Sequence, residues 1–259
     1  MTIRLPGLGP LLGVGGMTRC LLILPAIFCL IVGASAAVAA DSIVDEEFLN
    51  FVRVVEDPDG STNLRSSPSV EGRVIDKVPT GGVVAIERDR ESGKWAEVVR
   101  EEYKKPKAYI HVSRLRRLDQ WKTLAVGDWT REKEASAKLD GVEVKAASAP
   151  FKESDHSITK DPNGGVLVNG MAPWGQDGGM PQTALQLSVS QNGKAKKLPA
   201  EATRNLYEPN VGSLVLLTPS TADKHLLVAM MNGDGAGGYT VVWAFVNGVY
   251  VGRTVFVMF

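Results

Sequence analysis

The stretch of sequence that decides the fold reads DPDGSTNLRSSPSVEGRVIDKV at residues 57–78 and resumes as AYIHVSRLRRL at residues 108–118. Short runs of β-branched and aromatic residues in and between these segments are separated by turn residues, including Pro79-Thr80-Gly81-Gly82 and Ser92-Gly93. Such close spacing of apolar runs and turns predicts short strands and disfavours helices. Several short strands in one small region are typical of a small closed or nearly closed β-barrel, which leaves no long sheet edge exposed.

Three motifs make this prediction more specific. Asn63-Leu64-Arg65-Ser66-Ser67-Pro68-Ser69 forms a polar loop, Gly93-Lys94-Trp95-Ala96-Glu97-Val98 a tryptophan-bearing strand, and Ala108-Tyr109-Ile110-His111 an aromatic strand. Together they resemble the bacterial SH3-like domain, although Ser67 stands where that family usually has glycine. The resemblance covers residues 48–119. It implies a small β-barrel that binds cell-wall peptides or docks onto other proteins.

The polar loop and the two aromatic strands supply the candidate ligand-binding residues. We predict that the ligand-facing surface contains Asn63, Arg65, Trp95, Tyr109 and His111. Aromatic rings suit this role because they give a large contact area and, in tyrosine, a polar group as well. In the alternative interpretation Trp95 belongs to the core, Tyr109 supports the barrel and His111 makes a structural hydrogen bond.

Basic residues cluster on either side of the aromatic strand. The two clusters consist of Lys104, Lys105 and Lys107 and of Arg114, Arg116 and Arg117. We expect a solvated surface here, because Glu101, Glu102 and Asp119 lie nearby in the sequence. Contact with an anionic polymer or a membrane surface is the alternative.

The beginning of the chain is typical of a secretory signal peptide. Arg19 precedes the apolar run LLILPAIFCLIVGASA at residues 21–36, and further small residues follow. Because this run is short for a membrane span, we predict a signal peptide over residues 1–40, cleaved after Ala39 or Ala40. An uncleaved anchor is the alternative. The exported chain would be periplasmic or secreted and would have no stable membrane anchor.

Other residues of this segment bear on the exported chain. Met17 offers an alternative translation start, because MTRCLLILPAIF is a better signal start than MTIRLPGLG. Cys20 and Cys29 both lie within the predicted signal peptide. The exported chain would therefore have no cysteine with which to form a disulfide, a zinc site or a redox centre.

The composition narrows the class of protein further. The chain has 29 Lys and Arg and 29 Asp and Glu residues, so its net charge of +0 gives no general attraction for nucleic acid. Glycine is frequent and helical periodicity is scarce, which indicates a mainly β protein. Nothing in the sequence points to a cofactor or to a particular oligomeric state.

The remainder of the chain divides into two further parts. We take residues 41–119 as the SH3-like domain, residues 120–164 as a linker and partly structured segment, and residues 165–259 as an antiparallel β-sandwich-like domain. The segment 146–162 is rich in small residues and proline, which is typical of a loop. Hairpin turns are expected at Asn192-Gly193 and Asn247-Gly248, and the apolar end, VGRTVFVMF, is expected to be buried.

Two glycine-rich segments form a second candidate site. Gly233, Gly235 and Gly238 match a dinucleotide-binding spacing, but an expected strand follows them where that motif needs a helix. A calcium loop would need more carboxylates than Asp234 supplies. We therefore predict a wide turn here and no metal site. In an alternative, Trp174 of the other segment and Asp234 form a second ligand-binding site.

No catalytic constellation is evident. His156 directly follows Ser154 and Asp155, and residues adjacent in sequence cannot face one another as a catalytic triad requires. We expect an exported, non-catalytic binding protein whose SH3-like domain recognises a cell-wall peptide or an envelope protein. The alternatives are a structural or protein-docking role without wall binding, and a cell-envelope hydrolase with its site in the C-terminal domain.

Overall fold

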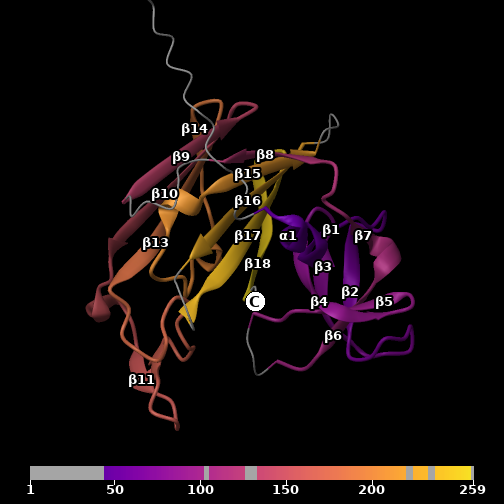
Figure 1. Cartoon of the computed structure of the whole chain (residues 1–259), viewed down its shortest axis with the longest axis horizontal. Helices are drawn as coiled ribbons and strands as arrows, with labels where there is room; N and C mark the ends of the chain where they lie inside the picture. The colour runs from indigo at the N-terminus through magenta and orange to yellow at the C-terminus, as the bar shows by residue number, and fades with distance from the viewer. Residues whose placement is uncertain (1–43, 102–104, 126–132, 220–223, 233–236, 258–259) are drawn as a thin grey trace, which may run out of the picture. The chain divides into compact units, whose positions relative to one another are not determined.

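The protein consists mainly of antiparallel sheets (Figure 1). The structure is a computed structural model, and it describes residues 44–101, 105–125, 133–219, 224–232 and 237–257. The prediction of a mainly β protein is confirmed. The predicted signal peptide lies outside the described residues, all of which belong to the compact unit Ala37–Phe259. In the described part of the chain, no helix is both long enough and apolar enough to cross a membrane.

The described residues of the N-terminal part form one seven-stranded sheet with the order β3-β2-β6-β5-β4-β1-β7. The elements are α1 (Glu46–Phe51), β1 (Val52–Val55), β2 (Ser61–Arg65), β3 (Val74–Pro79), β4 (Val83–Ser92), β5 (Trp95–Val98), β6 (Ala108–His111), η2 (Val112–Arg114) and β7 (Leu115–Arg116). The sheet curls around its own apolar core, whose buried members are Val55, Leu64, Val84, Ile86, Ala96, Val98, Ala108 and Ile110.

We predicted a closed or nearly closed β-barrel, and no closed barrel is detected among the described residues. Among the described residues β3 and β7 are the two ends of the sheet, and they are not hydrogen-bonded to each other. Strand β3 is poorly suited to a further partner, because Pro79 has no N–H and the N–H of Lys77 donates to Asp76 Oδ1 at 2.9 Å instead. Proline and charged side chains are common means of protecting a sheet edge.

The C-terminal part contains two larger sheets, of order β14-β13-β10-β9 and β18-β17-β16-β15-β8, and a separate hairpin, β11-β12. The elements are β8 (Trp121–Ala125), β9 (Glu134–Leu139), β10 (Val142–Pro150), η3 (Glu153–Asp155), β11 (Ile158–Lys160), β12 (Val166–Val168), β13 (Thr183–Gln191), β14 (Lys194–Lys196), η4 (Ala200–Ala202), η5 (Val211–Ser213), β15 (Val215–Pro219), β16 (His225–Asn232), β17 (Tyr239–Val246) and β18 (Val249–Phe256). Val144 and Leu185 of one sheet share a core with Val228 and Trp243 of the other. This face-to-face packing is the expected sandwich.

Both predicted hairpin turns are present. Asn192 and Gly193 have φ angles of 50° and 75°, and Asn247 and Gly248 have 52° and 71°. Two consecutive residues with positive φ produce the turn whose twist matches that of paired strands, and Asn-Gly adopts it readily. The last strand, β18, is buried at Thr254, Val255 and Phe256, as the apolar end of the sequence indicated.

Residues 120–164, which we predicted as a linker and partly structured segment, contribute strands to both larger sheets. Strand β8 pairs with β15 in the five-stranded sheet, and β10 pairs with β13 from Val142↔Gln191 to Pro150↔Thr183. The small residues of β10 misled the prediction, because alanine and serine resemble loop composition. Val144 and Ala146 are nevertheless buried in the sandwich core, where small side chains let the two sheets approach each other.

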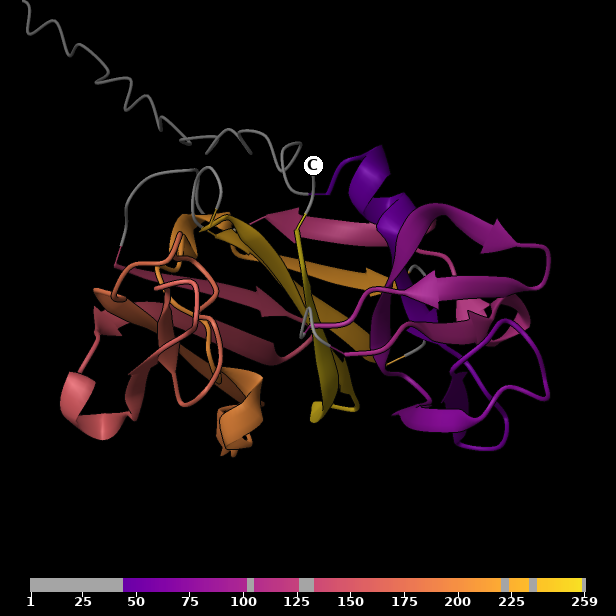
Figure 2. The ribbon, with the colours of Figure 1, turned by 90° about the horizontal axis from the view of Figure 1, so that it is seen from below.

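The five-stranded sheet is buried on both faces. Val228 and Trp243 point into the sandwich core, whereas Leu227 and Ala244 pack against α1, β1 and β4 of the N-terminal sheet. Figures 1 and 2 both show this sheet between the four-stranded sheet and the N-terminal strands. Burial on both faces explains why its strands are almost continuously apolar in sequence, since neither set of alternate side chains meets water.

Specific contacts fix the N-terminal sheet to the five-stranded sheet. The turn at Gly81 lies so close to Val246 and His225 that a Cβ at this position would collide with both side chains. Glu101, in the N-terminal part, forms an ion pair with Arg253 of β18, whose side chain is only 5% exposed. The two parts therefore meet through apolar packing, close backbone approach and a largely buried charge pair.

The first turn of the N-terminal sheet is organised by Asp57. Its carboxylate accepts hydrogen bonds from Thr62 Oγ1 at 2.6 Å and from the N–H of Asp59 at 3.0 Å, and it lies 3.3 Å from Arg114 Nη1. The hydrogen bond from Thr62, followed by that from Asp59, holds the pKa of this carboxyl below its usual value of 3.8. The charged form of Asp57 therefore stabilises the fold.

We predict that Leu227→Ala lowers the free energy of unfolding by about 2–5 kcal/mol, the usual cost of truncating a buried leucine. Leu227 is 1% exposed and lies in the core shared with β1 and β4. Amide hydrogen exchange should accelerate in β1 and β4 as well as in β16. Val249→Ala is the control, because Val249 is 61% exposed and its loss should change stability by less than about 0.5 kcal/mol. Unchanged protection of β1 and β4 in Leu227→Ala would contradict the shared core.

We predict that Asp57→Asn destabilises the protein at pH 7 and that its deficit relative to wild type shrinks as the pH falls below about 4. A carboxyl whose folded pKa is lowered contributes its stability above its unfolded pKa and loses it as the pH falls through the folded value. Urea denaturation at pH 7, 5 and 3.5 measures the difference. Asp119→Asn, at an exposed position, is the control. A deficit that stayed constant across this range would show that the charge of Asp57 is not responsible.

Candidate ligand-binding site

Strands β2, β6 and β5 place the predicted ligand-binding residues on one face of the N-terminal sheet. Arg65 of β2 lies opposite Tyr109 of β6, and Tyr109 lies opposite Glu97 of β5. In the next row His111 lies opposite Trp95. Directly opposed residues of antiparallel strands project to the same side, so these side chains share a face.

The two rings of the second row touch each other. The Trp95 and His111 ring centroids are 5.2 Å apart and the planes meet at 86°, an edge-to-face contact. Asn63 lies two residues from Arg65 along β2 and therefore on the same face. All five predicted residues are partly exposed, while the intervening Leu64, Ala96 and Ile110 are buried. The structure thus brings the predicted set together on an accessible surface.

His111 also has the structural role that the alternative interpretation gave it. Its Nδ1 lies 2.7 Å from Ser113 Oγ, and the N–H of Ser113 donates to the same nitrogen at 3.4 Å. These bonds orient the imidazole and cap the short helix η2. The ring also contacts Trp95 edge-to-face, so His111 can both support the turn and line the surface.

Glu97 is a member of this face that the sequence analysis did not single out. It is only 7% exposed, and its carboxylate accepts hydrogen bonds from Lys107 Nζ at 3.1 Å and from the Tyr109 hydroxyl at 3.4 Å. The carboxylate thereby fixes the position of the Tyr109 ring. The signal was available in the alternation of Trp95 and Glu97 along one strand, which puts both residues on the same side.

Arg65 is oriented by the polar loop that follows it. Its Nη1 donates to the carbonyl oxygen of Gly72 at 2.8 Å, which leaves other N–H groups of the guanidinium directed elsewhere. The backbone of this loop is itself tight, because a Cβ on Gly72 would collide with Ser67. The loop therefore holds the Arg65 side chain through its backbone, and the strand register places Arg65 opposite Tyr109.

The second basic cluster is engaged within the fold. Arg114 pairs with Asp57, and Arg117 donates to Asn50 Oδ1 at 2.8 Å. Arg116 lies 5.3 Å from the centre of the Trp121 ring and 3.3 Å from His225 Nδ1. These arginines stabilise local structure and the contact between the two parts of the chain.

The two glycine-rich segments of the second candidate site meet in the structure. The N–H of Gly175 donates to the carbonyl oxygen of Gly237 at 3.1 Å, and the Trp174 ring lies 6.0 Å from that of Tyr239. Asp234 lies outside the described residues. Burial raises the pKa of Tyr239, whose hydroxyl donates to the carbonyl oxygen of Tyr207. Trp174 and Tyr239 are therefore packed where the segments around Gly175 and Gly237 meet, and we call this meeting point the chain crossing.

A single carboxylate fastens this crossing to the sandwich. Glu208 accepts hydrogen bonds from Gln176 Nε2 at 3.0 Å, from the N–H of Gln182 at 2.6 Å, and from both the N–H and the hydroxyl of Thr183. Its own φ is 47°, an unusual value for a residue other than glycine. This set of bonds explains why the strained backbone of Glu208 persists.

The neighbours of His156 are an aromatic ring and an amide, whereas a triad histidine would contact a serine and a carboxylate. Its ring stacks on Phe151 with a centroid distance of 4.8 Å, and its Nδ1 lies 3.0 Å from Asn169 Nδ2. Ser154 donates to Asp155 instead of pairing with the imidazole. The adjacent Ser154, Asp155 and His156 do not form a relay.

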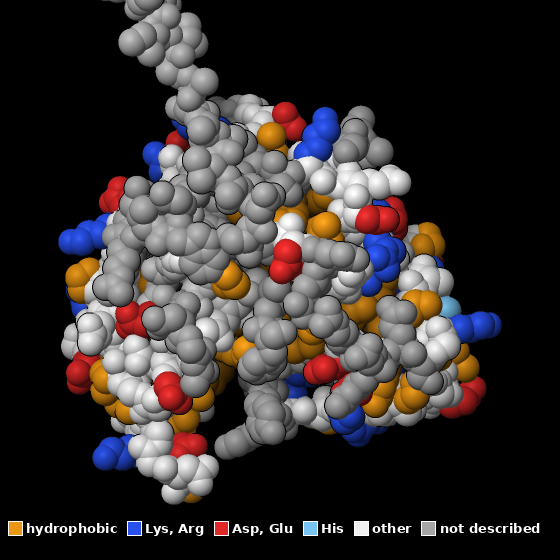
Figure 3. Space-filling model, in the orientation of Figure 1, with side chains coloured by type: hydrophobic (Ala, Val, Ile, Leu, Met, Phe, Trp, Pro, Cys, Tyr) orange, Lys and Arg blue, Asp and Glu red, His pale blue; other side chains and the backbone are white. Residues whose placement is uncertain are grey.

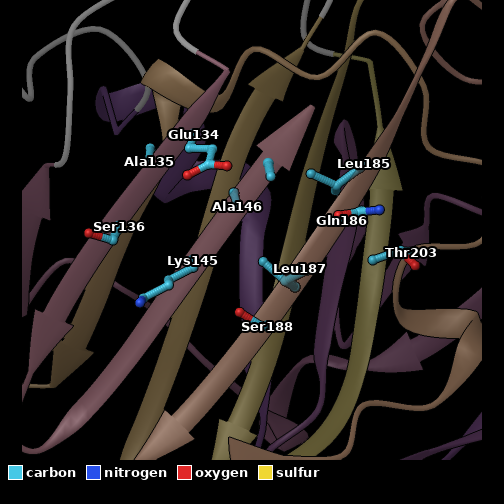
Figure 4. Close-up of a pocket in the computed structure, with 11 residues that line it drawn as sticks. Glu134, Ala135, Ser136, Lys145, Ala146, Leu185, Gln186, Leu187, Ser188 and Thr203 are labelled. Carbon is cyan, nitrogen blue, oxygen red and sulfur yellow. The ribbon is translucent and has the colours of Figure 1, made fainter. Parts of the chain in front are cut away.

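A shallow hollow of about 770 Å³ lies over strands β9, β10 and β13 of the four-stranded sheet. Figure 4 shows most of its lining residues on these strands, with Thr203 directly after η4. Small residues are prominent in the lining, among them Ser136, Ala147 and Ser188. Lys145, at its side, lies 3.5 Å from Glu143. The lining includes no aromatic ring, so the hollow lacks the flat contact area of the β2-β6-β5 face.

Comparison with known families identifies the family to which the N-terminal sheet belongs. Residues 60–116 match the family model described as the bacterial SH3 domain. This part of the chain is therefore a bacterial SH3 domain, as the three sequence motifs predicted. No curated protein and no solved structure matches the chain. The face of β2, β6 and β5 thus belongs to the part with a known family, and the C-terminal sheets have no family assignment.

We predict that Glu208→Ala lowers the free energy of unfolding by about 1–3 kcal/mol, because it leaves hydrogen-bond donors of Gln182 and Thr183 without their acceptor. Urea denaturation followed by tryptophan fluorescence measures the loss. Glu201→Ala, at an exposed position, is the control. Equal stability of the two variants would show that the carboxylate of Glu208 does not hold the chain crossing.

Proposed function

We propose that this protein is an exported, non-catalytic binding protein whose SH3 domain recognises a component of the cell envelope. The observation that carries the proposal is the grouping of Arg65, Tyr109, Trp95 and His111 on one accessible face of the domain. The bacterial SH3 domain is a binding module that is commonly associated with cell walls. The ligand is a cell-wall peptide or an envelope protein.

The way the SH3 domain packs supports this choice of face. Its apolar core with the five-stranded sheet draws on α1, β1 and β4, including Phe48, Val54 and Ala85. Strands β2, β6 and β5 contribute their buried side chains to the domain's own core instead. Their other face is thus left for a ligand while the domain stays fixed to the rest of the protein.

Export is part of the proposal and rests on the sequence of residues 1–40. A basic residue, a short apolar run and small residues are the features that direct secretion. The protein is then periplasmic or secreted. Cell fractionation followed by N-terminal sequencing tests this, and an intact Met1 or Met17 terminus in the cytosol would contradict it.

The proposal assigns no reaction to the protein. His156, the histidine nearest to a serine and an acid in sequence, is engaged by Phe151 and Asn169. The Trp174 region is occupied by chain packing. A cell-envelope hydrolase would need paired groups with separated pKa values. Release of soluble fragments from purified peptidoglycan by the protein would contradict a purely binding role.

We predict that Tyr109→Ala reduces retention on purified peptidoglycan by about ten-fold, the usual loss when a central aromatic contact is removed. Sedimentation of the protein with insoluble peptidoglycan measures retention. His156→Ala, on the C-terminal part, should bind like wild type. If folded wild type and Tyr109→Ala both stay in solution, wall binding is wrong, and an envelope protein becomes the partner to seek.

A further inference from the structure

We propose that the face of β2, β6 and β5 recognises carboxylate groups, and that its partner is an acidic peptide whose carboxylates lie against Arg65 and Lys77. This inference rests on the proposed function, because it takes the same face as the binding surface and names the chemistry that the face selects. Lys77, on β3, extends the set of residues that the sequence had singled out.

Lys77 belongs to this face by strand register. It lies directly opposite Asn63 in the pairing of β2 with β3, so the two side chains project to the same side. Arg65 lies two residues from Asn63 along β2, a separation of about 7 Å. The exposed Lys77 and the partly exposed Arg65 are therefore diagonal neighbours. Within the described residues neither makes an ion pair.

The acidic group on this face is already neutralised. Glu97 is buried, and its Oε1 lies 3.0 Å from Lys107 Nζ. Among the described residues of β2, β3, β5 and β6 and the adjoining Lys107, three cations and one carboxylate share this face, although the whole chain carries a net charge of +0. The cations are Arg65, Lys77 and Lys107. A local excess of positive charge on a neutral protein attracts anionic ligands at short range.

The rings decide which anion fits. Tyr109 stands between Arg65 and Glu97, and the Trp95 and His111 rings lie in the adjacent row. Cations without ion pairs at the β2 and β3 side and rings at the β5 and β6 side suit a ligand with carboxylates beside apolar or amide groups. A short acidic peptide has this pattern. A phosphate polymer carries charge at every unit, and a continuous row of cations would suit it better.

The test uses the full exported chain and purified peptidoglycan in three forms. One form is untreated, one has its free carboxyl groups converted to amides by carbodiimide and ammonia, and one is treated with hydrofluoric acid to remove phosphate polymers. We expect retention to fall at least five-fold on the amidated form and to stay unchanged on the acid-treated form. Retention on the untreated form should also weaken as salt is added, because exposed charges are screened.

Two variants connect the effect to the named residues. Arg65→Gln and Lys77→Gln should each weaken retention on untreated peptidoglycan about three- to five-fold, as expected for one exposed ion pair. They should change retention on the amidated form little. Lys194→Gln is the matched control, since it removes the same charge from an exposed residue of β14. Circular dichroism verifies that each variant is folded.

The outcomes separate this inference from the proposed function. Equal retention on the untreated and amidated forms would overturn carboxylate recognition and leave wall binding in place. Loss of retention on the acid-treated form would overturn it in favour of a phosphate polymer. Failure of the folded protein to bind any of the three forms would contradict wall binding itself, and carboxylate recognition on the wall with it.

Discussion

The rest of this structure depends on covering both faces of the sheet formed by β15 to β18 and β8. Alternate side chains of a strand project to opposite faces, so a strand that is apolar at every position needs a packing layer on each side. Strand β17 has this character, with Val241 and Trp243 on one face and Val242 and Ala244 on the other. The four-stranded sheet supplies one layer and the SH3 domain with α1 supplies the second. The SH3 domain is therefore a structural element of the whole protein as well as a domain with its own core.

Because of this arrangement, one side of the SH3 domain packs against the five-stranded sheet and, within the described residues, the β2-β6-β5 side does not. In β4, Val83 and Ala85 face the five-stranded sheet, and Val84 and Ile86 face the domain's own interior. Strands β2 and β6 alternate buried and partly exposed residues, and polar and aromatic side chains occupy the partly exposed face together with Trp95 of β5. The same constraint that fixes the domain therefore determines which of its surfaces remains open. Charged side chains of both signs are interspersed on the face shown in Figure 3, which agrees with the balanced composition.

Local sequence signals predicted the parts of the fold that depend on a few neighbouring residues. The Asn-Gly turns at 192–193 and 247–248 were predictable because this dipeptide suits one turn geometry. The grouping of Arg65, Tyr109 and Trp95 followed from the family resemblance of three motifs, whose strands are neighbours in the sheet. Strand β10 was missed because its alanines and serines carry no apolar alternation strong enough to distinguish a strand from a loop.

Features that depend on distant residues could not be read in the same way. The open order of the seven-stranded sheet follows from which edges meet, and Asp76, Lys77 and Pro79 act on the edge of β3 only once the strand is in place. Burial of Glu97 depends on Lys107 and Tyr109 closing over it. The packing of the SH3 domain on the five-stranded sheet could not be predicted either, because a run of apolar residues does not indicate which element will pack against it.

The close approach at Gly81 has a consequence for how such a protein can change over evolutionary time. Small domains are often exchanged between genes as independent cassettes, which requires a polar surface all around. Here the turn at Gly81 fits against Val246 and His225, and the outward side of β1 and β4 is apolar. A domain moved elsewhere would carry an exposed apolar patch prone to association, and a replacement inserted here would need an equally small residue at this turn. A substitution on one side of this contact therefore constrains what the other side can accept.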